Sequence, residues 1–283
     1  MLNELGGYTM FASCGAGFSG DISIYRLRSN DRLTWSLSPS TPVLVRGAAG
    51  AWDARAVETP SVVWFGGQYH MFYTGYPGDL NDTKSYRIGH ATSSDGVVWA
   101  RDPAFLGMPS DPNNPTPTMD FRQWVMAEPG AVVVGNTLHL YFTAIGADAG
   151  TATAMQTIGL MTTTDGVKWT APVMVLRPDQ AVYPRSVYYG YSTPAACVRN
   201  GQVTLFFSVV QDNPWGQVGI ANAVSTNGVS AWTLNTLPLI SRDVSWRSKE
   251  ALAPALLVDA AGTHLWFAGN DGQHLGIGYV KLP

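Results

Sequence analysis

The chain has 283 residues, of which 46% are hydrophobic, 11% aromatic and 13% charged, so it has ample apolar surface for a large core. The formal net charge is −3 without any basic cluster, which argues against binding to nucleic acid or to an anionic membrane. No apolar run approaches the roughly 20 residues that span a bilayer. The two cysteines and five histidines have no metal-ligand spacing, so neither a disulfide framework nor a catalytic zinc is expected.

In chain order, the first predicted strands lie in "GGYTMFASC" and in "DISIYRLRSNDRLTW", which ends at Trp35. In the stretch "ETPSVVWFGGQYHMFYTG", from Glu58, a strand equivalent to the one in "GGYTMFASC" is preceded by an additional strand. This stretch consists of a proline step, an apolar strand, a glycine turn and an alternating strand rich in aromatic residues. The same pattern recurs from Ala127, from Ser192 and from Leu252.

A second segment follows each of these pairs and also recurs, as in "YRIGHATSSDGVVW" and "QTIGLMTTTDGVKW". The Asp-Gly and Asn-Gly steps in these segments are strong signals for a tight turn between two strands. Each segment ends in a tryptophan, which we expect to pack between neighbouring repeats: Trp35, Trp99, Trp169 and Trp232.

The repeat occurs five times with a period of about 60 to 70 residues and without helical periodicity, which predicts an all-β, five-bladed β-propeller. Each blade is expected to be a four-stranded antiparallel sheet within a single domain. The first blade is predicted to lack its inner strand, and the last is predicted to stop after its third strand. The approximate blade boundaries are 1–38, 58–102, 127–172, 192–237 and 252–283.

In such a ring, the starts of the inner strands surround one pocket. The residues there are Glu58, Glu128, Thr193 and, a little earlier in its strand, Glu250. Two carboxylates across a pocket are what cleavage of a glycosidic bond requires. We expect Glu58 and Glu128 to occupy equivalent places in adjacent blades, although a glutamate at a strand start can also be a solvated cap. Glu250 can equally form an ion pair with Lys249 or Arg247.

Sugar sites also need aromatic surfaces for the ring faces and polar groups for the hydroxyls. Residues of both kinds precede the inner strands or lie in a rim loop. Each one alone can instead be a packed or solvated loop residue. The predicted substrate-binding residues are Trp52, Asp53, Arg55, Asp120, Arg122, Trp124, Tyr189, Tyr191, Asp212, Trp215 and Trp246.

The segments "GGQYHMFYTGY" and "IGHATSSDGVVW" resemble strands of the five-bladed propeller glycoside hydrolases, the clan that contains families 32 and 43. That resemblance covers essentially the whole chain and implies three carboxylates on the first three inner strands. By position, Glu128 looks like the acid, and Glu58 takes the second role in place of the usual aspartate. The first-blade carboxylate is missing. Four alternatives are open: the chain lacks an upstream segment, catalysis uses only Glu58 and Glu128, Asp53 or Glu250 is the base, or the protein has lost activity.

The resemblance implies no required cofactor, although relatives sometimes hold calcium in the central channel; His274 is a weak candidate ligand. The "S-x-D-G-x-x-W" segments are also similar to the Asp box of sialidases, but one residue is missing between Asp and Gly. We therefore rank a sialidase-like enzyme below a family 43 or 32-like glycosidase.

We expect a glycoside hydrolase that acts on an oligo- or polysaccharide, with a non-catalytic carbohydrate-binding propeller as the alternative and a protein-interaction scaffold as a third possibility. The expected partner is a carbohydrate, with no nucleic acid or membrane, and the protein is expected to be a monomer or a weak homo-oligomer. A secreted or periplasmic location is expected, although this chain shows no signal peptide.

Overall fold

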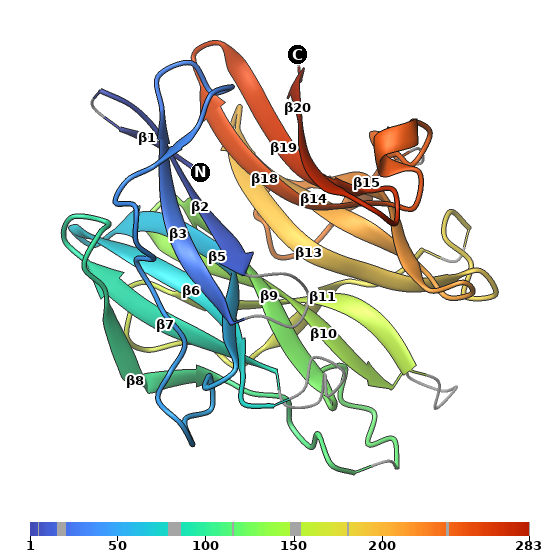
Figure 1. The fold of residues 1–283 in the computed structure, drawn as a ribbon. Helices are drawn as coiled ribbons and strands as arrows, with labels where there is room; N and C mark the ends of the chain where they lie inside the picture. The colour runs from blue at the N-terminus through green and yellow to red at the C-terminus, as the bar shows by residue number, and fades with distance from the viewer. Residues whose placement is uncertain are drawn as a thin grey trace.

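The structure is a computed structural model that describes residues 1–4, 6–15, 21–78, 86–114, 116–147, 154–179, 181–235 and 238–282. Its regular elements are β-strands, apart from one short 3-10 helix, η2 (Ser245–Arg247), in this part of the chain. Figure 1 shows these strands as twisted sheets. Within the described residues, no helix has the length and apolar character needed to cross a membrane.

The strands follow the predicted repeats and fall into successive antiparallel groups. The first group contains β1 (Leu2–Glu4), β2 (Gly7–Gly15), β3 (Ile22–Ser29) and β4 (Ser36–Leu37). The second contains β5 (Ala56–Phe65), β6 (Gln68–Tyr76), β7 (Arg87–Ser93) and β8 (Ala100–Gly107). The third contains β9 (Val125–Val134), β10 (Thr137–Ala147), β11 (Ala154–Thr163) and β12 (Val173–Leu176).

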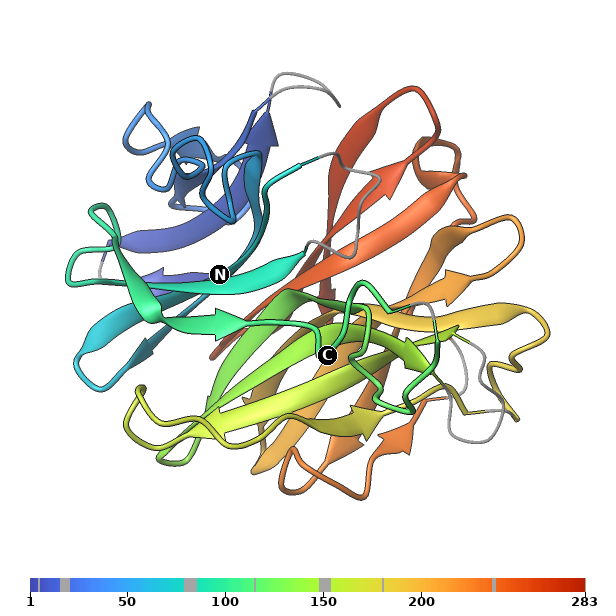
Figure 2. The ribbon, with the colours of Figure 1, turned by 90° about the horizontal axis from the view of Figure 1, so that it is seen from below.

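The fourth group contains β13 (Tyr188–Arg199), β14 (Gln202–Gln211), β15 (Gly216–Ser225), β16 (Thr233–Leu234) and β17 (Ile240–Ser241). The last contains β18 (Glu250–Asp259), β19 (Gly262–Asn270) and β20 (Leu275–Leu282). Figure 2 shows the groups following one another around a common centre. The first strands of neighbouring groups contact each other there, as β5 does with β9 and β9 with β13.

The first group differs from the prediction, because it does have an inner strand. Strand β1 pairs with the start of β2, with Leu2 opposite Thr9 and Glu4 opposite Gly7. Sequence reasoning missed this strand because three residues without apolar alternation carry no strand signal. β1 corresponds to the far end of an inner strand, since the matching register in the second group pairs Val63 with His70.

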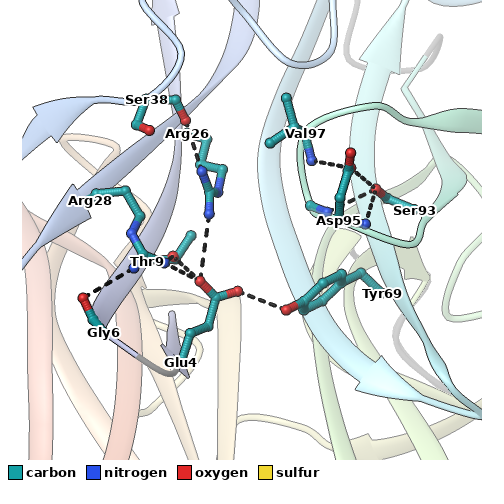
Figure 3. A network of polar contacts seen from close by, with 11 residues as sticks. Glu4, Gly6, Thr9, Arg26, Arg28, Ser38, Tyr69, Ser93, Asp95 and Val97 are labelled. Atoms are coloured by element: carbon teal, nitrogen blue, oxygen red, sulfur yellow. Dashed lines mark hydrogen bonds and ion pairs between the residues drawn. The ribbon is translucent and has the colours of Figure 1, made fainter.

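The carboxylate of Glu4 holds this short strand in place (Figure 3). It accepts hydrogen bonds from Thr9 Oγ1 at 2.6 Å and from the Tyr69 hydroxyl at 2.8 Å, and it forms ion pairs with Arg28 and Arg26. Burial raises the pKa of Glu4, but these hydrogen bonds and positive charges outweigh it and hold the pKa below its usual value. Because Tyr69 lies on β6, the network also joins the first group to the second.

The recurring Ser/Thr-x-Asp/Asn-Gly segments are turn structures. In the turn after β7, Ser93 Oγ accepts hydrogen bonds from the backbone N–H groups of Asp95 and Gly96, and Asp95 accepts them from Val97 and Val98 (Figure 3). Three further turns repeat this pattern from the pairs Ser29 and Asp31, Thr163 and Asp165, and Ser225 and Asn227. These side chains therefore serve the scaffold.

The repeated tryptophans pack between groups, as predicted. Each ring meets an aromatic side chain on the second strand of the preceding group, edge to face at centroid distances from 5.5 to 6.1 Å. The pairs are Trp99 with Phe11, Trp169 with Phe72, Trp232 with Tyr141, and Trp35 with Trp266. The last pair joins the first group to the final one and so closes the ring.

A bulge interrupts the first strand of every group from the second onward, at the residue before the proline. The residues there have positive φ values of 50°, 52°, 48° and 53°: Thr59, Glu128, Thr193 and Ala253. A side chain in this region strains the backbone. Each backbone N–H donates to a hydroxyl on the second strand of the preceding group, at 2.7 to 3.0 Å. We call this contact the bulge latch; its acceptors are Ser13, Thr74, Thr143 and Ser208.

Replacing Ser208 with alanine should destabilise the ring by about 1–3 kcal/mol, because the part-buried N–H of Ala253 and the buried hydroxyl of Thr193 both lose a partner. Thermal or denaturant unfolding measures the change. The control Thr233→Ala removes an exposed hydroxyl of β16 and should stay within about 0.5 kcal/mol of wild type. Equal stabilities of the two variants would show that the latch contributes nothing.

Candidate active site

The inner strands surround a central channel of roughly 330 Å³, lined by small and apolar side chains. The four prolines that follow the bulge residues all line it: Pro60, Pro129, Pro194 and Pro254. Glu58 and Glu128 precede two of these prolines. The carboxylates therefore belong to the mouth of the channel, where the strands begin, and not to its wall.

Glu128 is a bulge residue, and its side chain contacts the next bulge latch, which joins Thr143 to Thr193. Its Oε2 accepts a hydrogen bond from Thr143 Oγ1 at 2.7 Å and one from the backbone N–H of Thr193 at 3.0 Å. Its own N–H donates to Thr74 Oγ1 at 2.7 Å. The backbone and the carboxylate of Glu128 are thus both fixed, by groups from its own sheet and from the two neighbouring sheets.

Glu58 lies one position earlier in its strand than expected. It is two residues before its proline and still pairs with Thr74 of β6, whereas Glu128 directly precedes its proline. The positions equivalent to Glu128 are Thr59 and Thr193, so the prediction that Glu58 and Glu128 occupy equivalent places is wrong by one residue. The bulge accounts for the difference, because it lets two successive residues at a strand start approach the same pocket.

The two carboxylates interact electrostatically. Burial, followed by the charge of Glu128, raises the pKa of Glu58 to about 7. Burial also raises the pKa of Glu128, and the hydrogen bonds from Thr143 and Thr193 only partly offset this effect. Two buried carboxyl groups that disfavour each other's ionisation share protons as a pair. The pair can therefore retain a proton close to neutral pH, as acid catalysis requires.

Glu250 is the first residue of β18 and accepts a hydrogen bond from the Asn270 amide at 2.8 Å. The ion pair considered for it with Arg247 is not formed, because Arg247 contacts Asp243 at 2.5 Å. Glu250 lies four residues before Pro254, farther from the bulge than the other two glutamates. It is a rim residue with a neutral partner.

Several predicted substrate-binding side chains make internal contacts instead. Asp53 is buried in an ion pair with Arg101 at 3.0 Å, and Trp52 stacks on Tyr73 with ring centroids 5.8 Å apart. Tyr191 is fully buried against Phe207. We therefore assign these three residues to the scaffold. Trp246 packs on Phe267 and retains a partly exposed ring.

The other predicted contacts keep polar or exposed surface. Trp215 is 61% exposed in the loop between β14 and β15, next to the exposed Asp212. Tyr189 lies under the guanidinium of Arg185, at 5.5 Å.

The remaining candidates hold neighbouring loops together. Arg55 forms an ion pair with Asp21, Arg122 approaches Asp120 at 3.8 Å, and Trp124 donates to the Asn114 carbonyl.

Sequence reasoning placed Thr193 at the pocket but missed the other hydroxyl residues around the carboxylates, chiefly Thr74 and Thr143. The available signal was the small hydroxyl residue that recurs in "FYTG", "YFTA" and "FFSV". A second missed neighbour is Tyr76, whose pKa is raised first by burial and then by the charge of Glu58.

The channel gives no support to a calcium site. Calcium takes six to eight oxygen ligands, whereas no group of three or more His, Cys, Asp or Glu residues in the described ranges is arranged to hold a metal. His274 is exposed and lies 3.3 Å from Asp271 on a turn before β20.

Residues 58–181 match the family model of the glycosyl hydrolases family 32 N-terminal domain. No curated protein matches the chain. Among solved structures, an endo-arabinase from Bacteroides thetaiotaomicron is 14% identical, with a TM-score of 0.69 over 99% of this chain and 90% of its own. An alpha-L-arabinanase mutant from Cellvibrio cellulosa is 12% identical, with a TM-score of 0.69 over 100% and 90%.

A thermostable family-43 glycoside hydrolase is 13% identical, with a TM-score of 0.68 over 98% of this chain and 91% of its own. At these identities the solved structures show a shared fold. The match over residues 58–181 supports the resemblance to family 32, and the solved structures show that the chain shares the fold of a family-43 glycoside hydrolase and of arabinanases.

Proposed function

We propose that the protein is a five-bladed propeller whose strand groups are the blades, and that it hydrolyses an oligo- or polysaccharide at the channel mouth. Glu128 is the general acid and Glu58 the paired carboxylate. The observation that carries this assignment is the electrostatic coupling of two carboxyl groups from adjacent blades, both with raised pKa values. Glycosidic bond cleavage uses such a pair.

The hydrogen bonds of Glu128 suit it to protonate a leaving oxygen. Both donors, the Thr143 hydroxyl and the Thr193 N–H, approach Oε2, so Oε1 is the oxygen that carries the transferable proton. Burial keeps that proton bound until the leaving oxygen accepts it. When Glu58 is ionised, it supplies the negative charge that activates water or stabilises the developing positive charge on the sugar.

The rim offers surfaces for a sugar chain. The exposed ring of Trp215 suits the apolar face of a pyranose or furanose, and Asp212 and Glu250 supply acceptors for hydroxyl groups. Because polysaccharides are degraded outside the cell, we also propose a secreted or periplasmic location for the enzyme.

A carbohydrate-binding propeller without catalysis is the second candidate. It is favoured by the exposed ring of Trp215 and the exposed Asp212 in the same rim loop, which serve sugar binding without any catalytic step. Such a protein would bind glycans on an array and release no reducing ends from them.

Glu128→Gln and Glu58→Gln should each lower hydrolysis by at least about 100-fold, because the first removes the proton donor and the second the paired charge. Release of reducing sugar from a panel of aryl glycosides and polysaccharides measures the rate. Asp243→Asn, on the exposed Arg247 pair, is the control and should retain wild-type activity. Full activity in both glutamine variants would refute the assignment.

Glu58→Gln should also change how stability depends on pH. With a folded pKa of about 7 against a reference value of 4.5, Glu58 favours folding at low pH, and this contribution disappears as pH rises through 7. The melting temperature of the variant, measured relative to that of wild type, should therefore be higher at pH 8 than at pH 5. Each kcal/mol of this change in stability corresponds to about 2–4 °C.

The control for this experiment is Glu4→Gln. The pKa of Glu4 is lowered, so its contribution to folding is present at high pH and lost at low pH. Because pH 5 and pH 8 both lie above the reference value of 4.5, this variant should differ from wild type by the same melting temperature at both pH values. A Glu58→Gln difference that is likewise independent of pH would contradict the raised pKa of Glu58.

A further inference from the structure

Tyr76 lies beside Glu58 through the register of β5 and β6. Thr74 is directly opposite Glu58, and Tyr76 is directly opposite Ala56. Directly opposed residues share a face of the sheet, and so do residues two apart on one strand, which places all four side chains on one face. A long aromatic side chain reaches a diagonal neighbour in this arrangement.

The hydroxyl of Tyr76 is buried and has no hydrogen-bond partner among the described residues. Its ring is held separately, stacked on Tyr86 with centroids 4.6 Å apart and planes 16° apart. Packing therefore accounts for an aromatic ring at position 76 but not for its hydroxyl group. A buried hydroxyl without a partner disfavours folding, so phenylalanine would serve packing better at this position.

The charged groups around Tyr76 and Glu58 are Glu128, Arg55 and, through its ion pair with Arg55, Asp21. Glu128 faces Glu58 from β9, and its charge contributes to the raised pKa of Glu58. Burial and the charge of Glu58 raise the pKa of Tyr76, and Arg55 opposes them. The backbone N–H of Arg55 donates to the Tyr76 carbonyl at 3.0 Å, while its guanidinium forms an ion pair with Asp21 at 3.2 Å. Tyr76 is thus a neutral donor next to a carboxyl group.

We propose that Tyr76 is a positioning residue for Glu58, and that its hydroxyl donates a hydrogen bond to the Glu58 carboxylate when that group is ionised. The inference rests on the proposed function, in which Glu58 acts in its charged form. The hydrogen bond holds the carboxylate in one orientation and favours its ionisation in a pocket that otherwise opposes it. When Glu58 is protonated, the need for this donor disappears.

A stability cycle tests the contact without a substrate. Melting temperatures are measured at pH 5 and pH 8 for wild type, Tyr76→Phe, Glu58→Gln and the double variant. Tyr76→Phe should be at least as stable as wild type at pH 5, where Glu58 is protonated and the hydroxyl has no partner, and less stable at pH 8, because the ionised carboxylate has lost its donor. In the Glu58→Gln background, the effect of Tyr76→Phe should be the same at both pH values.

Tyr141→Phe is the matched control, since that buried hydroxyl donates to the Gly228 carbonyl at 2.6 Å, between two other blades. It should lower the melting temperature equally at both pH values. A Tyr76→Phe effect that is independent of pH, or that shows the same pH dependence in the Glu58→Gln background, would overturn the proposal.

Kinetics separate this inference from the proposed function. On a hydrolysed substrate, Tyr76→Phe should lower kcat about 10-fold and move the acidic limb of the kcat/KM profile about one pH unit higher. An unmoved acidic limb would overturn the positioning role. If wild type cleaves no glycan on the panel, the proposed function fails, while the stability cycle still decides whether Tyr76 bonds to Glu58.

Discussion

A hydroxyl that accepts the backbone N–H of a strained bulge in the next sheet is the contact on which the other features depend. It recurs at Ser13, Thr74, Thr143 and Ser208, always from one strand group to the following one. Each latch fixes the position at which the next inner strand enters the channel. The positive φ at the bulge is tolerated because this bond and the proline that follows hold the chain in place.

The latch also shapes the electrostatics of the site. At Glu128 the latch donor carries a carboxylate, and the next latch, between Thr143 and Thr193, binds that carboxylate. Glu58 lies in the regular ladder instead, one residue before its own bulge. One carboxyl group is therefore held by fixed donors, while the other is governed by burial and by its neighbour's charge. This difference suits the two groups to different roles.

The sequence was informative where a pattern repeats. Prolines marked the inner strands, Asp-Gly steps marked the turns, and Trp99 and its equivalents marked the contacts between sheets. It failed where one residue departs from the pattern. The spacing of Glu58 to its proline already differs from that of Glu128, but the consequence of this offset depends on the bulge that follows Glu58, and Asp53 is buried because Arg101, distant in sequence, pairs with it. Similarly, Tyr76 resembled any other strand aromatic until the register placed it beside Glu58.

The junction between the first and last groups is made by side chains. Arg32 contacts Asp259 at 2.7 Å and His264 at 2.8 Å, and Trp35 meets Trp266 across the same boundary. Arg32 takes the left-handed turn position that glycine occupies in the other three turns. This junction therefore behaves as a clasp whose ionic part weakens with salt, whereas the backbone bridges that link other groups are insensitive to it. Ionic strength therefore acts on the closure of the ring through this contact.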